Sequence, residues 1–104
     1  MIVVPETLTA RAAVRTDAAE RYAKQLVSHL GRKVEFTIDG PTSTGTIAGG
    51  TGVIQVGDGV IILLAEAPDA ETLGRVQDVL GRHLERFGRR NELTVVWTAD
   101  QPAS

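Results

Sequence analysis

The chain has 104 residues, a formal net charge of −2 and 42% hydrophobic residues. This length fits a single domain, residues 1–104, with enough apolar side chains for a core. The absence of cysteine excludes disulfides, thiolate metal sites and cysteine nucleophiles. The slightly acidic charge argues against nucleic acid or an anionic membrane as a partner bound by bulk electrostatics.

The N-terminal residues show no targeting signal. Residues 1–6 lack the basic opening and the long apolar run of a secretory signal. No stretch approaches the ~18 apolar residues that a membrane helix requires. We therefore expect a cytoplasmic protein, with an ordered core of about residues 7–98 and flexible tails at 1–6 and 99–104.

A strand from Thr7 to Arg15 is predicted first, followed by a helix. Thr16 or Asp17 is expected to cap this helix, and Gly31 is expected to end it. Its apolar residues recur at three- and four-residue spacings, which is typical of one buried stripe. The stripe consists of Ala19, Tyr22, Ala23, Leu26 and Leu30.

Four short strands are predicted in the middle of the chain, at about residues 34–38, 44–48, 51–56 and 60–67. Turn-forming residues separate them, and Gly49-Gly50 and Asp58-Gly59 are two-residue hairpin signals. A last strand is predicted over residues 93–97. Hairpins this close together indicate an antiparallel meander.

A long amphipathic helix is predicted from Asp69 to Phe87. Asp69 suits the N-cap and Gly88 the end. Gly74 and Gly81 share one side of it, which predicts a close approach there, most simply by the first helix. The apolar stripe consists of Leu73, Val76, Leu80, Leu84 and Phe87. Pairs of acid and base four residues apart are expected on the wet side: Glu71–Arg75, Asp78–Arg82 and Glu85–Arg89.

The predicted order is strand, helix, four strands, helix, strand. Two one-sided helices beside an antiparallel meander indicate an α+β fold. We expect a two-layer sandwich, in which a mainly antiparallel sheet of about six strands carries both helices on one face.

Two histidines lie at the margins of the helical stripes. His29 follows Leu26 by three residues, and His83 follows Leu80 by three. If the helices run side by side, the imidazoles meet, which makes both residues candidates for binding a ligand or a metal ion. The alternative is that both are structural histidines that bridge the layer. No carboxylate is clearly placed as a third metal ligand, no catalytic residue is assigned, and no cofactor is expected.

The sheet face opposite the helices is predicted to be apolar. If Ile61 and Leu63 point to the helices, the residues between them point away. An apolar outer face of a single sheet indicates a partner, most simply a second copy, so we expect a homodimer. The alternatives are that a terminal segment covers this face, or that its apolar residues are scattered and have no role. The dimer-face candidates are Val53, Val60, Ile62, Leu64 and Val96.

Four motifs together resemble the bacterial family catalogued as domain of unknown function 2218. The resemblance covers about residues 9–98. The motifs are Val14-x-Thr16-x-x-Ala19-x-Arg21-Tyr22-x-x-x-Leu26-x-x-His29, Glu66-Ala67-Pro68-Asp69, His83-Leu84-Glu85-Arg86-Phe87 and Glu92-Leu93-x-Val95-x-Trp97.

The resemblance implies a compact α+β fold similar to the TATA-binding-protein-like domains, which include the last domain of phosphohexomutases. It implies no established activity. In that family the domain stands alone or is appended to siderophore-interacting, flavin-dependent ferric reductases, and histidines stand at the positions of His29 and His83. This chain departs from the family at Ile62 and Leu64, where charged residues are expected, and lacks an aromatic residue near Gly49.

Three functions remain open. The favoured one is a non-catalytic accessory or binding module for an unidentified small molecule, linked to iron or siderophore handling by family context alone. The second is a small metal- or ligand-dependent enzyme that uses His29 and His83. The third is a structural domain that associates with itself.

Overall fold

The computed structural model describes residues 7–89 and 93–99. Apart from Ala99, the expected flexible tails lie outside the described residues. The order of elements confirms the predicted β-α-β-β-β-β-α-β arrangement and the α+β class. The elements are β1 (Leu8–Arg15), α1 (Ala19–Leu30), β2 (Phe36–Asp39), β3 (Thr42–Ile47), β4 (Gly50–Gly57), β5 (Val60–Ala67), α2 (Ala70–Phe87) and β6 (Thr98–Ala99).

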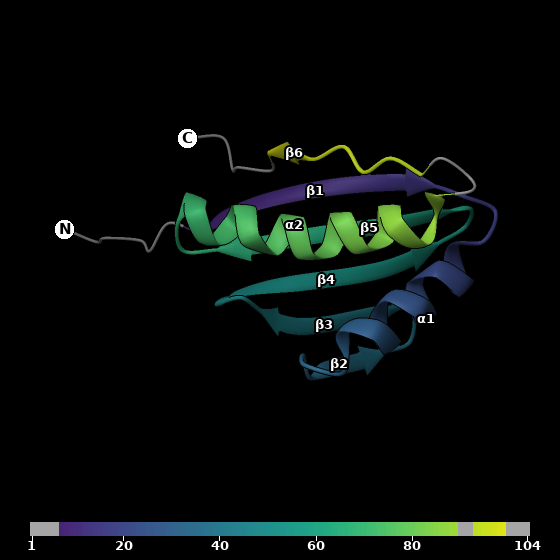
Figure 1. The fold of residues 1–104 in the computed structure, drawn as a ribbon, viewed down its shortest axis with the longest axis horizontal. Helices are drawn as coiled ribbons and strands as arrows, with labels where there is room; N and C mark the ends of the chain where they lie inside the picture. Colours follow the sequence, from purple (N-terminus) through teal and green to yellow (C-terminus); the bar gives the residue numbers. More distant parts are fainter. Residues whose placement is uncertain (1–6, 90–92, 100–104) are drawn as a thin grey trace.

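The sheet has six antiparallel strands in the order β2-β3-β4-β5-β1-β6. The first strand of the chain therefore lies between β5 and β6, and β2 forms the opposite edge. Both helices cover the same face of the sheet, with α2 over β5 and α1 crossing toward β2 (Figure 1). Within the described residues, no helix has both the length and the apolar character that crossing a lipid bilayer requires.

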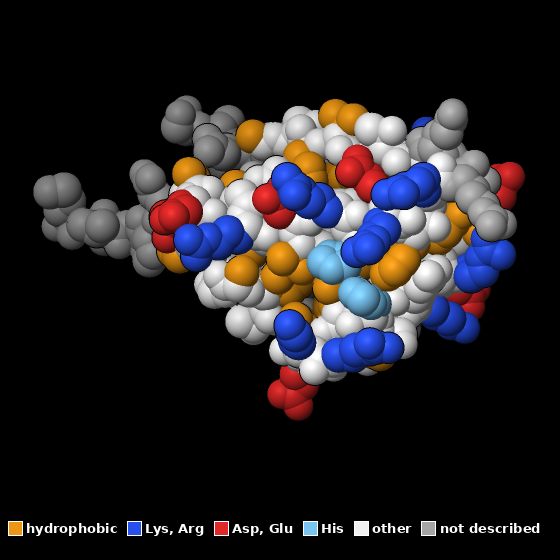
Figure 2. All heavy atoms as spheres, in the orientation of Figure 1, with side chains coloured by type: hydrophobic (Ala, Val, Ile, Leu, Met, Phe, Trp, Pro, Cys, Tyr) orange, Lys and Arg blue, Asp and Glu red, His pale blue; other side chains and the backbone are white. Residues whose placement is uncertain are grey.

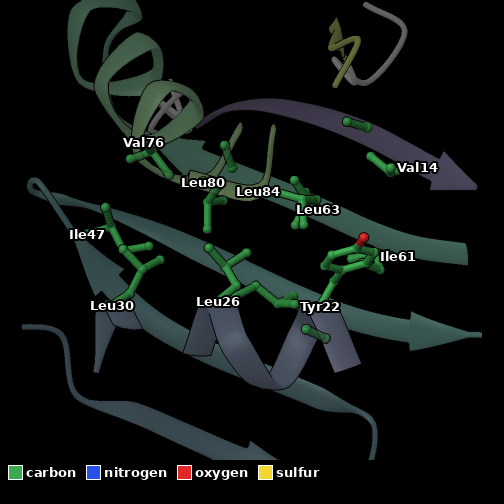
Figure 3. Close-up of a cluster of buried hydrophobic side chains, with 14 of the residues drawn as sticks. Val14, Tyr22, Leu26, Leu30, Ile47, Ile61, Leu63, Val76, Leu80 and Leu84 are labelled. Carbon is green, nitrogen blue, oxygen red and sulfur yellow. The ribbon is translucent and has the colours of Figure 1, made fainter. Parts of the chain in front are cut away.

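The core lies between the helices and the sheet. Ile61, Leu63 and Ala65 of β5 are fully buried, and the residues between them are only half-buried. Every residue of the stripe predicted for α1 is buried. Side chains from both helices and from the sheet converge there (Figure 3). Burying one such aliphatic side chain contributes about 1.5–3 kcal/mol, so this layer dominates the stability of the fold.

The helix starts differ in how well the sequence predicts them. The Asp69 carboxylate accepts a hydrogen bond of 2.7 Å from the Thr72 N–H, as an N-cap should. This hydrogen bond holds the pKa of Asp69 below its usual value. At α1 the N-cap is Ala18, not Thr16 or Asp17. The Thr16 hydroxyl instead accepts from the Ala18 N–H at 3.2 Å, which forms a short turn before the helix.

The hairpin between β3 and β4 turns one residue earlier than predicted. Ile47 pairs with Gly50, so Ala48 and Gly49 form the turn, with φ of 52° and 93°. Two positive φ values in succession are typical of a type I′ turn. Gly50 is the first residue of β4, and the position requires glycine because a Cβ there would collide with the carbonyl oxygen of Glu66.

The last strand begins later and is shorter than predicted. Residues 93–97 form no strand, and only Thr98–Ala99 pairs with β1. The alternating apolar residues Leu93, Val95 and Trp97 pack against the core from beside α2 instead. The Glu85 carboxylate fixes this segment, since it accepts a 2.9 Å hydrogen bond from the Val95 N–H. Val96 is 69% exposed and lies outside the strands that the structure describes, and its membership of the dimer face stays a prediction.

The close approach predicted at the helix glycines exists, but α1 does not make it. A Cβ at Gly81 would lie 3.1 Å from Trp97 Nε1 and 3.5 Å from Val95 Cγ1. Gly74 has no such neighbour within 4 Å. Gly81 therefore gives room to the C-terminal segment.

Candidate functional site

Two helices bring His29 and His83 together. Leu26 and Leu80, three residues before each histidine, are fully buried, so the histidines lie on the flanks where α1 and α2 meet. Their ring centroids are 5.0 Å apart and the ring planes are tilted by 43°. Figure 2 shows the two side chains next to each other in the middle of the helical face.

A hydrogen bond orients the His83 ring. Its Nδ1 lies 2.6 Å from the carbonyl oxygen of Val79, one turn earlier in α2. A carbonyl oxygen only accepts, so Nδ1 carries the proton and donates. In the neutral imidazole the lone pair is therefore on Nε2. Histidines that bind metal ions characteristically donate the other ring N–H to a carbonyl or carboxylate in this way.

Phe87 completes an aromatic group of three. Its ring meets the His29 ring edge-on, with centroids 5.4 Å apart and an interplanar angle of 79°. Phe87 follows His83 by one turn, so one flank of α2 supplies both rings. Phe87 and His83 are half-buried, whereas His29 is exposed. The imidazole pair therefore packs against the Phe87 ring, and its His29 ring is exposed to solvent.

Basic side chains border the imidazole pair, and some of them are paired with acids. Figure 2 shows Lys and Arg side chains on both sides of the two histidines. Helical spacing puts Arg86 one turn from His83 and on its solvent side. Arg82 is 3.7 Å from Asp78, and this pair is exposed. Glu85, which was expected to pair with Arg89, is engaged by the Val95 N–H on the other flank of α2. These surroundings favour a ligand that carries negative charge.

The protein donors near the pair are few. Among residues 7–89 and 93–99, no three His, Cys, Asp or Glu side chains are grouped as metal ligands. The imidazoles therefore offer two nitrogen donors to a metal ion, and any remaining positions would be filled from solution. This arrangement can bind a ligand through imidazole nitrogen atoms.

A groove that the sequence reasoning missed lies on the opposite flank of α1. It has a volume of about 550 Å³ and separates α1 from β2, β3 and β4. The exposed ion pair of Glu20 and Lys24, 3.3 Å apart, lines it. The signal in the sequence was Val27 and Ile38, two apolar residues outside the predicted stripes. Its apolar lining includes Ala23, Val27, Ile38, Ile54 and Val56.

The outer sheet face carries four of the five dimer-face candidates. Val53 lies opposite Leu64 across the β4–β5 ladder, and Ile62 lies opposite Ala13 of β1. The candidates Val53, Val60, Ile62 and Leu64 are half-buried. Arg11 and Arg15 are paired with Leu64 and Val60 and border the strip. That this strip mediates dimerisation stays a prediction.

Comparison with known proteins identifies the fold and the family. No curated protein matches the chain. The NMR structure of PA4090 from Pseudomonas aeruginosa is similar, with a TM-score of 0.73 and 23% sequence identity; the match covers 88% of this chain and 95% of that one. At this identity, the similarity shows the fold alone. Residues 11–98 match the family described as "Uncharacterized protein conserved in bacteria (DUF2218)", and the chain belongs to this family.

Proposed function

We propose that this domain is a non-catalytic binding module for a transition-metal ion held in an anionic chelate, and that His29 and His83 bind the metal. One observation carries the proposal. The His83 ring donates Nδ1–H to Val79, which leaves Nε2 free for a ligand, and its ring centroid lies 5.0 Å from that of a second imidazole. A histidine needed only for packing would not require that second imidazole.

The distance between the rings suits a shared metal ion. Imidazole nitrogens bind zinc at about 2.0–2.1 Å, so two ligating nitrogens lie about 3 Å apart. A ring centroid is about 1 Å from each ring atom, and rings 5.0 Å apart bring two nitrogens this close after a small rotation. A hydrogen bond to the Val79 carbonyl fixes the His83 ring, whereas the His29 ring is exposed. We therefore expect the His29 ring to make that rotation.

The chemistry of the ligand follows from the number of metal-coordinating atoms that the protein supplies. Two imidazoles fill only part of the coordination shell that Zn²⁺, Ni²⁺, Cu²⁺ or Fe²⁺ prefers. A chelator that carries carboxylates or other anionic oxygens supplies the rest, and Arg86 favours its charge. The link to iron and siderophore handling, drawn from family resemblance, is consistent with this ligand class. It stays part of the proposal.

The probe that tests this function is Ni²⁺–nitrilotriacetate, because that tetradentate chelate leaves two positions for imidazole. Isothermal titration is expected to give one bound chelate per chain. His83→Asn should abolish binding without unfolding the protein, because the Asn amide retains a donor for the Val79 carbonyl but lacks Nε2. His29→Asn should abolish binding as well.

Two controls make the outcome decisive. Gln77→Asn changes another half-buried residue of α2 and should leave binding unchanged. Arg86→Gln should weaken binding of the anionic chelate but leave binding of free Ni²⁺ unchanged. Equal binding by the wild type and both histidine variants, with all three folded, would remove the proposed site.

A further inference from the structure

The edge of β2 that faces away from β3 takes no part in the proposed imidazole site. Among the residues that the structure describes, no other strand or helix lies beyond β2 at that edge of the sheet (Figure 1). Ile38 in this strand is 65% exposed and lines the apolar groove beside α1. An unpaired strand edge offers a row of backbone donors and acceptors to another strand. An exposed Ile next to that edge adds apolar area for a partner to cover.

The hairpin fixes which backbone groups point outward. Asp39 pairs with Thr42 around the two-residue turn Gly40-Pro41, and Gly40 has a φ of 60°. The pair that closes a two-residue hairpin is hydrogen-bonded, and hydrogen-bonded pairs alternate along an antiparallel ladder. Thr37 and Asp39 therefore bond to β3. The N–H and C=O groups of Phe36 and Ile38 point away from the sheet.

We infer that the sheet edge at residues 34–38, which comprises the start of β2 and the two residues before it, pairs with the same edge of a second copy of this chain, antiparallel and about a twofold axis at Phe36. In this register Phe36 lies opposite Phe36 of the second copy, and Ile38 lies opposite Val34. The Val34 N–H is already bonded to the Leu30 carbonyl at 2.8 Å. Each copy then donates the N–H groups of Phe36 and Ile38 and accepts at the carbonyls of Val34 and Phe36.

Charge selects this register. It places Asp39 of each copy beside the turn that carries the exposed Arg32 and Lys33 of the other. An axis at Thr37 would instead place Glu35 opposite Asp39 twice, and like charges directly opposite are destabilising. An axis at Ile38 would place Asp39 opposite Thr37 and leave Val34 without a partner. The register at Phe36 pairs Ile38 with Val34 and brings opposite charges together.

The same register covers the exposed apolar surface. Phe36 and Val34 lie over Gly45 on the helical side of the sheet, and Ile38 shares that side because it is two residues from Phe36. Val34 of the second copy then packs beside Ile38. A twofold axis perpendicular to the sheet also keeps both α1 helices on one side of the joined sheet.

The test is the molar mass in solution by light scattering over a concentration series. The wild type is expected to reach twice its 11.1 kDa. Ile38→Pro should give the monomer, because proline removes an outward N–H but no bond of the β2–β3 ladder. Ile38→Thr keeps that N–H and should still dimerise. Circular dichroism checks that both variants fold.

A charge exchange tests the register itself. Asp39→Lys places like charges at both ends of the paired strands and should raise the dimer dissociation constant by about tenfold. Adding Lys33→Asp and Arg32→Asp to that variant should restore the dimer. A wild type that stays monomeric overturns the inference. So does a dimer that Ile38→Pro and Asp39→Lys leave unchanged, and dissociation by Ile62→Arg would then assign the dimer to the outer sheet face.

Discussion

The two flanks of α2 differ in how they are closed. On one flank, Gly81 gives room to Trp97, and Glu85 holds the Val95 N–H at 2.9 Å. On the other flank, His83 faces the exposed His29 of α1 across a ring-centroid distance of 5.0 Å. The first flank is sealed by the chain itself, whereas the second leaves ring nitrogens open to solvent.

This difference separates stability from binding. Tight contacts and satisfied hydrogen bonds on the C-terminal flank leave no room for a ligand, so changes there should alter the free energy of unfolding. The imidazole flank buries less, so changes there should alter binding more than stability. Each prediction below applies this division to named residues.

The largest effect is expected from Trp97→Ala. Removing a half-buried indole that packs on Gly81 leaves a void beside α2, and the free energy of unfolding should fall by about 2–3 kcal/mol. Chemical denaturation measures it. Val96→Ala is the matched control, because Val96 is 69% exposed and its loss should change stability by less than about 0.5 kcal/mol. Equal effects of the two substitutions would contradict the sealed flank.

A smaller loss is expected from Glu85→Ala. The Val95 N–H would lose its acceptor, which should cost about 1–2 kcal/mol. Glu85→Gln retains an acceptor oxygen and should lose less. Hydrogen exchange at Val95 gives a second reading, since its amide should exchange faster in the Ala variant. Unchanged exchange there would show that the carboxylate does not hold this segment.

The two helix glycines should respond differently to substitution by alanine. Gly74→Ala should raise the free energy of unfolding by about 1 kcal/mol, because nothing lies within 4 Å of the added Cβ. Gly81→Ala should gain less or lose stability, because its Cβ would lie 3.1 Å from Trp97 Nε1. Thermal melts of both variants decide this. Equal gains would mean that the C-terminal segment is not held against α2.

The smallest effect concerns the start of α2, which belongs to neither flank. The hydrogen bond from the Thr72 N–H lowers the pKa of Asp69 from its ordinary value of 3.8. The ionised cap therefore adds stability above the unfolded-state pKa, and this stability is lost as the pH falls through the folded-state pKa. Asp69→Asn caps without titrating, so its melting temperature should fall less than that of the wild type on acidification. Parallel pH curves would contradict this assignment.

The sequence was most informative where periodicity and burial coincide. The stripe predicted for α1 matches the buried set, and β5 has the predicted bounds and alternation. The N-cap at Asp69 was equally predictable, because the Asp69 carboxylate accepts a hydrogen bond from an N–H only three residues later in the chain. The meeting of His29 and His83 was foreseeable because each lies three residues after a core leucine.

The sequence failed where tertiary contacts override local pattern. The alternation of Leu93, Val95 and Trp97 is that of a strand, yet these residues pack from beside α2, which no local rule specifies. The turn falls on Ala48, which takes a positive φ, and not on the Gly49-Gly50 pair. Gly50 lies instead inside β4, where only glycine fits beside the Glu66 carbonyl of the neighbouring strand. The groove beside α1 was missed because it depends on where β2 lies under the helix.

The most direct test of the central claim, that His29 and His83 form one metal site, is ¹⁵N NMR of the two imidazoles during titration with Ni²⁺–nitrilotriacetate or its diamagnetic Zn²⁺ counterpart. We expect His83 to carry its proton on Nδ1 before the titration. The Nε2 signal of His83 and one nitrogen signal of His29 should then change together, with the same midpoint. Separate midpoints, or signals that do not change while the Zn²⁺ chelate is in excess, would contradict a shared site.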